Sequence, residues 1–302
     1  MSTLIYSVRT DWPEQAVRIQ RDRQRVRRAI LLVAVAIGPG VFVADRLAGT
    51  VAWRSFAGEA LSLCLYAAVA VWYALRHDPR KAWRVASLVY VTGLAIMGVV
   101  DFSTKRGLSA LLVDSPRANE PILWSGALML LFVPSLVWVA RRYPLEMSGV
   151  GFGRGHSLSR LGVYVLAGLG VGLLTGFHFW LTAKSAGIEL HLQPWPYAFW
   201  QFCYEVGPQS LTEELFMRGV VFNELYFGRD WDFWTAALAA SGLELLSLLV
   251  KQDYSADILI IAGVVFYTVV SAVLSAGLFR WSRSVVPGYV HNVVFGVVSL
   301  FR

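Results

Sequence analysis

Long apolar runs recur along the chain from residue 29 onward, and they constrain the fold more than any other feature. A run of about 20 apolar residues with few charges is long enough to cross the hydrocarbon core of a bilayer as a helix. Hydrophobic residues make up 56% of the 302 residues and charged residues 16%. In a soluble domain, hydrophobic residues make up about 45–50% and charged residues about 25%. The sequence therefore predicts an all-α integral membrane protein that crosses the bilayer repeatedly.

The apolar runs predict a bundle of about eight or nine transmembrane helices. Nine candidate spans lie at residues 29–45, 58–75, 82–100, 121–140, 158–181, 197–226, 232–250, 257–279 and 285–301. No stretch between them is long enough to bury a hydrophobic core of its own, so we expect no soluble domain.

Basic residues gather in alternate loops, beginning with residues 17–28, which carry six arginines. The positive-inside rule then places the N-terminus in the cytoplasm, and the composition favours a bacterial inner membrane. The net charge of +7 is accounted for by these loops and their contact with anionic lipid. No basic patch stands apart from a membrane flank, so nucleic acid is not an expected partner.

The sixth span contains an unusual charged segment, "SLTEELFMRGVV" (residues 210–221). Each ionisable group at membrane depth costs about 2.5–3.5 kcal/mol, which marks such groups as functional candidates. Glu214 and Arg218 are four residues apart and are predicted to form an intrahelical ion pair. Glu213 has no obvious intrahelical cation, which makes it the candidate general base toward water. The alternative is a salt-bridged helix end that only anchors the chain at the interface.

The residues before this segment predict a disturbed helix with one polar face. Gly207 and Pro208 favour a kink or break just ahead of the charges. Glu205, Gln209 and Glu213 recur every four residues and should share one helix face. In the fifth span, the glycines of "GLGVGLLTG" (residues 168–176) permit close helix packing.

The predicted topology brings a histidine to the depth of the motif. Glu213 lies about 16 residues along a span that runs inward, and His291 lies about 6 residues along one that runs outward. Both are then in the cytoplasmic half, where they can meet. A histidine there can polarise a carbonyl, relay a proton or bind a metal. The alternative is a histidine that is simply packed.

The segment "EELFMRG" (residues 213–219) resembles the EExxxR motif of the CPBP family, the CAAX-protease and bacteriocin-processing intramembrane proteases. The similarity extends from about residue 145 onward. There, "LEMSGVGFGR" resembles the loop that opens the family core, and "SAVLSAGLFRWSRSVVPGYVHN" resembles its last two helices. We therefore divide the chain into a basic cytoplasmic arm (1–28), helices without a recognised counterpart (29–144) and a CPBP-like core (145–302).

The resemblance implies a helical membrane core in which Glu213 activates water for attack on a peptide bond. It implies that His291 binds a metal or stabilises the oxyanion. The expected substrate is a membrane-associated protein or peptide within or beside the lipid bilayer. Glu214 is a further candidate catalytic residue, and Arg218 has an orienting role.

Two positions depart from the family pattern. The second motif normally has a histidine, but residues 240–250 contain none, and Glu244 is the only ionisable group in that span. Glu244 either replaces the histidine or pairs with a neighbour such as Arg218. Phe295 stands where the third motif normally has Asn or Asp. Asn292 follows His291 directly, is turned by about 100° and should point elsewhere, in an orienting role.

These departures leave an incomplete ligand set for a metal. The family is sometimes described as metal-dependent, but one histidine with two or three carboxylates is a poor zinc site, so no residue is assigned as a metal ligand and the cofactor stays open. The predicted function is intramembrane endopeptidase activity through glutamate-activated water. The main alternative is a catalytically impaired relative that binds a membrane partner or peptide. A third reading is a transport or channel-like protein.

Overall fold

The computed structural model describes residues 66–75, 84, 86–88, 90–92, 127, 129–152, 158–192, 194–251 and 258–297. Every regular element in these residues is helical and none is a strand, which confirms the all-α fold class. The predicted arm at 1–28 and the first span at 29–45 lie outside the described residues. The predicted number of eight or nine spans therefore stays a prediction.

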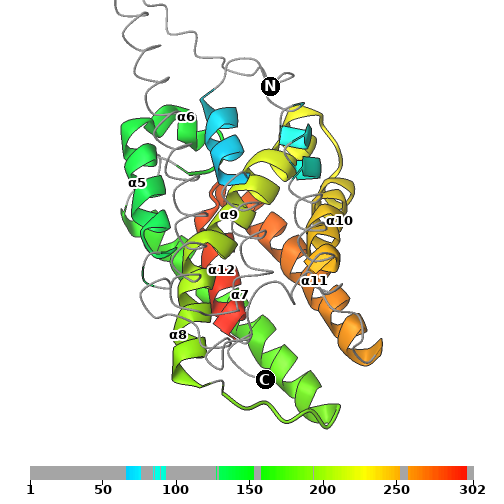
Figure 1. Cartoon of the computed structure of the whole chain (residues 1–302). Helices are drawn as coiled ribbons and strands as arrows, with labels where there is room; N and C mark the ends of the chain where they lie inside the picture. Colours follow the sequence, from blue (N-terminus) through cyan, green and yellow to red (C-terminus); the bar gives the residue numbers. More distant parts are fainter. Residues whose placement is uncertain are drawn as a thin grey trace, which may run out of the picture.

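The helical order in the second half follows the predicted fifth to ninth spans (Figure 1). Its elements are α5 (Phe132–Arg142), α6 (Pro144–Ser148), α7 (Leu158–Ser185), α8 (Trp195–Tyr204), η2 (Glu205–Gln209), α9 (Ser210–Glu213), η3 (Glu214–Phe222), η4 (Glu224–Gly228), α10 (Phe233–Lys251), α11 (Ile258–Ser282) and α12 (Val286–Gly296), where η denotes a π-helix. Residues 144–148, expected as part of a loop, form the short helix α6.

Two of these helices are long and apolar enough to cross a membrane, at Ser159–Ser185 and Ile261–Ser282. Only 22% and 28% of their most apolar windows are buried inside the protein. A core helix of a soluble protein would be covered on most sides, so helices this apolar and this exposed indicate contact with lipid.

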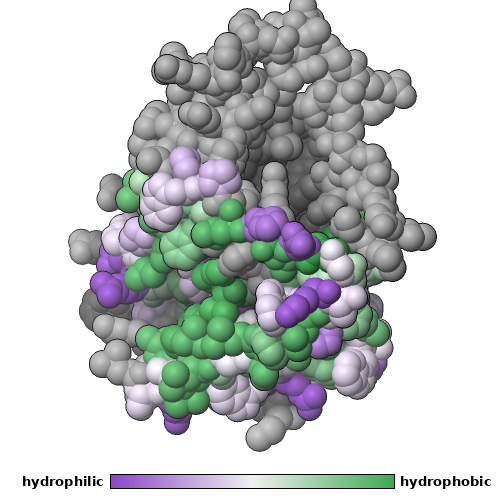
Figure 2. All heavy atoms as spheres, turned by 90° about the horizontal axis from the view of Figure 1, so that it is seen from below, coloured by the Kyte–Doolittle hydropathy of each residue, from purple (hydrophilic) through white to green (hydrophobic). Residues whose placement is uncertain are grey.

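The outer surface of the bundle is hydrophobic. Figure 2 shows a broad hydrophobic area on the described part of the underside, with hydrophilic residues around it. Large exposed apolar side chains on α7, α10 and α11 include Leu166, Leu173, Leu174, Phe177, Leu238, Leu246 and Phe266. A soluble monomer rarely exposes so many large apolar side chains on neighbouring helices, so this surface is suited to hydrocarbon.

The starts of α10 and α12 carry local sequence signals. Asp232 precedes α10, and its Oδ1 accepts a hydrogen bond from the Thr235 backbone N–H at 3.0 Å. Hydrogen bonds from the Thr235 side chain and backbone hold the pKa of Asp232 below its ordinary value. Pro287 occupies the first turn of α12, where its missing N–H costs nothing. These local signals fix where α10 and α12 begin.

The sixth predicted span is one helical stretch that widens into π turns instead of breaking. Pro208 has no N–H to donate to the carbonyl four residues earlier. The chain adopts the π-helix η2 here, and the Ser210 N–H bonds to the Glu205 carbonyl five residues back. The predicted disturbance at Gly207 and Pro208 is therefore present as a π-helix, a form that occurs often at functional sites.

Helix α7 packs closely against α12 because two glycines face it (Figure 1). A Cβ atom on Gly168 would lie 2.4 Å from the Pro287 carbonyl oxygen, and one on Gly172 would lie 2.7 Å from Val294 Cβ. A Cβ on Gly170 would meet nothing within 4 Å. The predicted role of this glycine segment in close helix packing is confirmed for Gly168 and Gly172, which are four residues apart.

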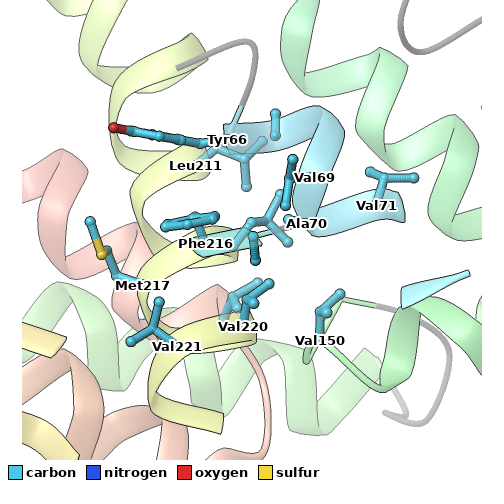
Figure 3. Close-up of a cluster of buried hydrophobic side chains, with 14 of the residues drawn as sticks. Tyr66, Val69, Ala70, Val71, Val150, Leu211, Phe216, Met217, Val220 and Val221 are labelled. Carbon is cyan, nitrogen blue, oxygen red and sulfur yellow. The ribbon is translucent and has the colours of Figure 1, made fainter. Parts of the chain in front are cut away.

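The described residues before 100 share a hydrophobic core with the motif helix, which is the helical stretch from Trp195 to Gly228 that carries the charged segment (Figure 3). The Tyr66 and Phe216 rings stack with centroids 4.8 Å apart, and Tyr90 stacks on Phe216 at 5.9 Å. The Tyr90 hydroxyl donates to the Leu243 carbonyl of α10. Chain segments on both sides of the predicted boundary at residue 145 therefore pack into one core.

Candidate functional site

Glu214 is completely buried where the motif helix meets α12. Its Oε1 atom accepts a 2.8 Å hydrogen bond from Asn292 Nδ2 and lies 3.4 Å from Arg218 Nε. Gly288 makes this approach possible, because a Cβ atom there would lie 2.1 Å from Glu214 Oε2. The predicted pair of Glu214 and Arg218 is confirmed, and a hydrogen bond to α12 is added to it.

Arg218 lies between two carboxylates from different helices. Besides Glu214, its Nη1 atom forms an ion pair with Glu244 Oε2 of α10, and both Arg218 and Glu214 are at most 1% exposed. Of the two roles left open for Glu244, pairing with Arg218 is the one the structure shows. This ion-pair triad of Glu214, Arg218 and Glu244 links the motif helix to α10.

Glu213 lies on another side of the helix from Glu214. It is half-buried, and Gln209 Nε2 donates a hydrogen bond to its Oε1 atom. The Tyr204 hydroxyl donates to Gln209 Oε1 at 2.7 Å. The expected polar face of Gln209 and Glu213 is therefore present, and Glu213 is the more accessible of the two motif glutamates.

His291 is fully buried on α12 among hydroxyl groups. The Ser275 hydroxyl lies 3.1 Å from His291 Nδ1, while Thr175 and Ser271 each lie 3.5 Å from Nε2. Phe295 stands where the resemblance expects Asn or Asp, and its ring stacks with the imidazole at a centroid distance of 6.4 Å. The hydrogen bonds of His291 thus go to hydroxyls of α7 and α11, and none of those described reaches Glu213.

Asn292 joins this histidine to the buried ion-pair triad. Its Oδ1 atom accepts hydrogen bonds from Ser271 at 3.1 Å and Ser275 at 3.5 Å, and its amide donates to Glu214. Asn292 is expected to point elsewhere, but its side chain shares both serines with His291. A continuous polar network therefore runs from His291 through Ser275 and Asn292 to Glu214.

The structure thus connects five of the six predicted site residues: Glu214, Arg218, Glu244, His291 and Asn292. Glu213 lies beside this polar network, with Gln209 as its hydrogen-bonding partner. The meeting of Glu213 and His291 stays a prediction, while the described hydrogen bonds link His291 to Glu214 through Ser275 and Asn292. Sequence reasoning missed Ser271 and Ser275, although their four-residue spacing on an apolar helix was the available signal.

No group of three or more His, Cys, Asp or Glu side chains lies close enough to hold a metal ion among the described residues. The groups around His291 are hydroxyls and an amide, which do not make a zinc ligand set.

Comparison with known proteins gives no relative for this chain. No family model matches it, and neither a curated protein nor a solved structure does.

Replacing Gly288 with alanine is expected to lower the free energy of unfolding by about 1–3 kcal/mol, the range for an overpacked core. The new Cβ would lie 2.1 Å from Glu214 Oε2, and Asn292 and Arg218 hold that carboxylate in place. Thermal unfolding in detergent micelles measures the effect. Gly277→Ala is the control, since its Cβ would meet only Phe233 Cζ at 4.0 Å. Equal effects of the two variants would contradict the assigned contact.

Proposed function

We propose that the chain is a polytopic protein of a bacterial inner membrane with a CPBP-like core. The two exposed apolar helices and the hydrophobic outer surface support a membrane location. The segment from Glu213 to Gly219 and its place inside a helical bundle support the resemblance. Two completely buried charged groups in a membrane helix, Glu214 and Arg218, would mark a functional site.

Within this class, we propose that the protein is an intramembrane endopeptidase with Glu213 as the general base. The different environments of the two adjacent glutamates give this proposal its best support. Glu214 is completely buried and held by Arg218 and Asn292, while Glu213 remains half-exposed. A general base has to reach water and substrate, and Glu213 is the motif carboxylate in a position to do so.

The proposed reaction is hydrolysis of a peptide bond in a membrane-associated protein or peptide. The Glu213 carboxylate accepts a proton from water, and the water oxygen attacks the carbonyl carbon. The tetrahedral intermediate then collapses, the C–N bond breaks, and the proton passes to the leaving nitrogen. His291 acts as a positioning residue, because its hydroxyl neighbours hold Asn292 against Glu214.

The test is the Glu213→Gln variant of the purified protein in lipid vesicles. The probes are a prenylated C-terminal peptide, a bacteriocin leader and a membrane-anchored signalling peptide, each with a fluorescent group on either side of the peptide bonds. Loss of a general base lowers the rate by about 10²–10⁴-fold, so cleavage should fall by at least about 100-fold. Glu224→Gln is the control, a half-buried glutamate on the same helical stretch whose partners are Tyr73 and Arg229. Cleavage that persists in Glu213→Gln would overturn the proposed mechanism.

One observation favours a second candidate, a protein of the same fold that binds a membrane peptide without cutting it. The segment that corresponds to the family's second motif has no histidine, and its one ionisable group, Glu244, is engaged with Arg218. In that case the native protein leaves every probe intact, while native and Glu213→Gln proteins retain the same probe equally in a vesicle flotation assay.

A further inference from the structure

Four polar side chains form a stripe along the motif helix, at Gln201, Glu205, Gln209 and Glu213. All four are half-buried. Gln201 Nε2 donates to Glu205 Oε1 at 3.1 Å, and Gln209 donates to Glu213. The polar stripe therefore extends from the second half of α8 to the proposed general base.

The π-helix keeps this polar stripe on one side of the helix. In an α-helix each four-residue step overshoots a full turn by about 40°, so a stripe with this spacing drifts around the axis. A π turn holds more residues, so the step from Glu205 to Gln209 falls short of a full turn and reverses the drift. Pro208, which favours the π turn, thus aligns Gln201 with Glu213.

The polar stripe faces a different environment from the lipid-facing side of the same helix. Phe202 is next to Gln201 and is 41% exposed, which suits contact with hydrocarbon. Half-exposed amides and carboxylates in hydrocarbon would lose hydrogen bonds to water at a cost of several kcal/mol. Intramembrane polar groups therefore face the bundle interior or a water-filled space.

Helix α12 borders the polar stripe along its middle. A Cβ atom on Gly296 would lie 2.9 Å from Glu205 Oε2, and the Tyr289 hydroxyl donates to the Val206 carbonyl at 2.7 Å. The Ser210 hydroxyl adds a contact of 3.4 Å to Glu205 Oε2. The polar stripe thus runs inside the bundle beside α12 while staying half-accessible.

We propose that the polar stripe is the path by which water reaches Glu213 from the aqueous phase at the Trp195 end of α8. This inference rests on the proposed hydrolysis, which consumes one water per peptide bond in a region where water is scarce. Amide and carboxylate groups at each turn can bind water molecules in succession. Trp195 is 69% exposed at the outer end of the path, where an interfacial tryptophan is common.

Cysteine labelling in sealed vesicles tests the path without any need for cleavage. Single cysteines replace Gln201, Glu205, Gln209 or Phe202 in a background in which Cys64 and Cys203 are alanine. A charged, membrane-impermeant thiosulfonate is added to the side that carries the Trp195 end. Resistance to trypsin, equal to that of the background protein, identifies the variants that are folded.

We expect Q201C, E205C and Q209C to react, with rates that fall in that order, and F202C to react at least 10-fold more slowly than Q201C. Phe202 is the matched control because it is exposed but faces lipid, where a thiol does not ionise and a charged reagent does not enter. Reaction of F202C at the rate of Q201C, or no reaction at both 205 and 209, would overturn the water path. The labelling pattern is independent of peptide cleavage, so loss of the proposed function leaves this result interpretable.

Discussion

Replacing Arg218 with leucine is expected to lower the free energy of unfolding by about 3–5 kcal/mol. The guanidinium lies between Glu214 and Glu244, and the Arg218 and Glu214 side chains are only 1% and 0% exposed. Its removal leaves the completely buried Glu214 and the half-buried Glu244 without a cation. Titration of the protein in mixed micelles with sodium dodecyl sulfate, followed by tryptophan fluorescence, measures the change.

Two further variants identify the cause of this loss. Arg141→Leu removes an exposed arginine at the end of α5 and should change stability little. A triple variant with leucine at 214, 218 and 244 removes all three charges together, and apolar replacement of a buried ion-pair network is often neutral or stabilising. Two results would contradict the role of the ion-pair triad. One is a loss of unfolding free energy in Arg218→Leu that is as small as in Arg141→Leu. The other is a triple variant that is less stable than Arg218→Leu.

Valine at both Gly168 and Gly172 should separate α7 from α12 and remove most of the folded protein. Each added side chain meets atoms that cannot move aside easily, since the Pro287 carbonyl oxygen lies 2.4 Å and Val294 Cβ 2.7 Å from the new Cβ positions. Overpacking costs about 1–3 kcal/mol at each site, so the two valines together remove about 2–6 kcal/mol from a stability that is about 5–15 kcal/mol in most domains. Since α12 carries His291 and Asn292, the polar network should be disrupted as well.

The control for this prediction is on the same helix. A Cβ atom on Gly170 would meet nothing within 4 Å, so Gly170→Val should leave the yield of folded protein close to that of the native chain. Size-exclusion chromatography in detergent gives the folded fraction of each variant. A Gly170→Val variant as damaged as the double variant would show that helix propensity, and not contact with α12, limits the fold.

Local sequence patterns were sufficient to predict much of the helical order. Apolar runs marked α7, α10, α11 and α12, and the spacing of Glu214 and Arg218 predicted their ion pair. Pro208 signalled an irregular helix, because a missing N–H is visible in any sequence. Each of these inferences depends on residues within a few turns of one another.

Contacts between distant helices were much harder to predict. The pairing of Arg218 with Glu244 was one of two open alternatives, since it depends on how α10 packs against the motif helix. The link from His291 through Ser275 and Asn292 to Glu214 requires three helices at defined rotations. A depth argument placed His291 near the motif, but depth alone does not determine which glutamate an imidazole approaches.

The aromatic stack of Tyr66, Tyr90 and Phe216 has a consequence for biosynthesis. The chain is made from its N-terminus, so both tyrosines are synthesised well before the motif helix exists. Until then their rings, later almost completely covered, have no Phe216 to pack against. The earlier part of the chain therefore has an incompletely packed surface until the motif helix is synthesised. The last half of the chain expressed alone would in turn leave Phe216 uncovered.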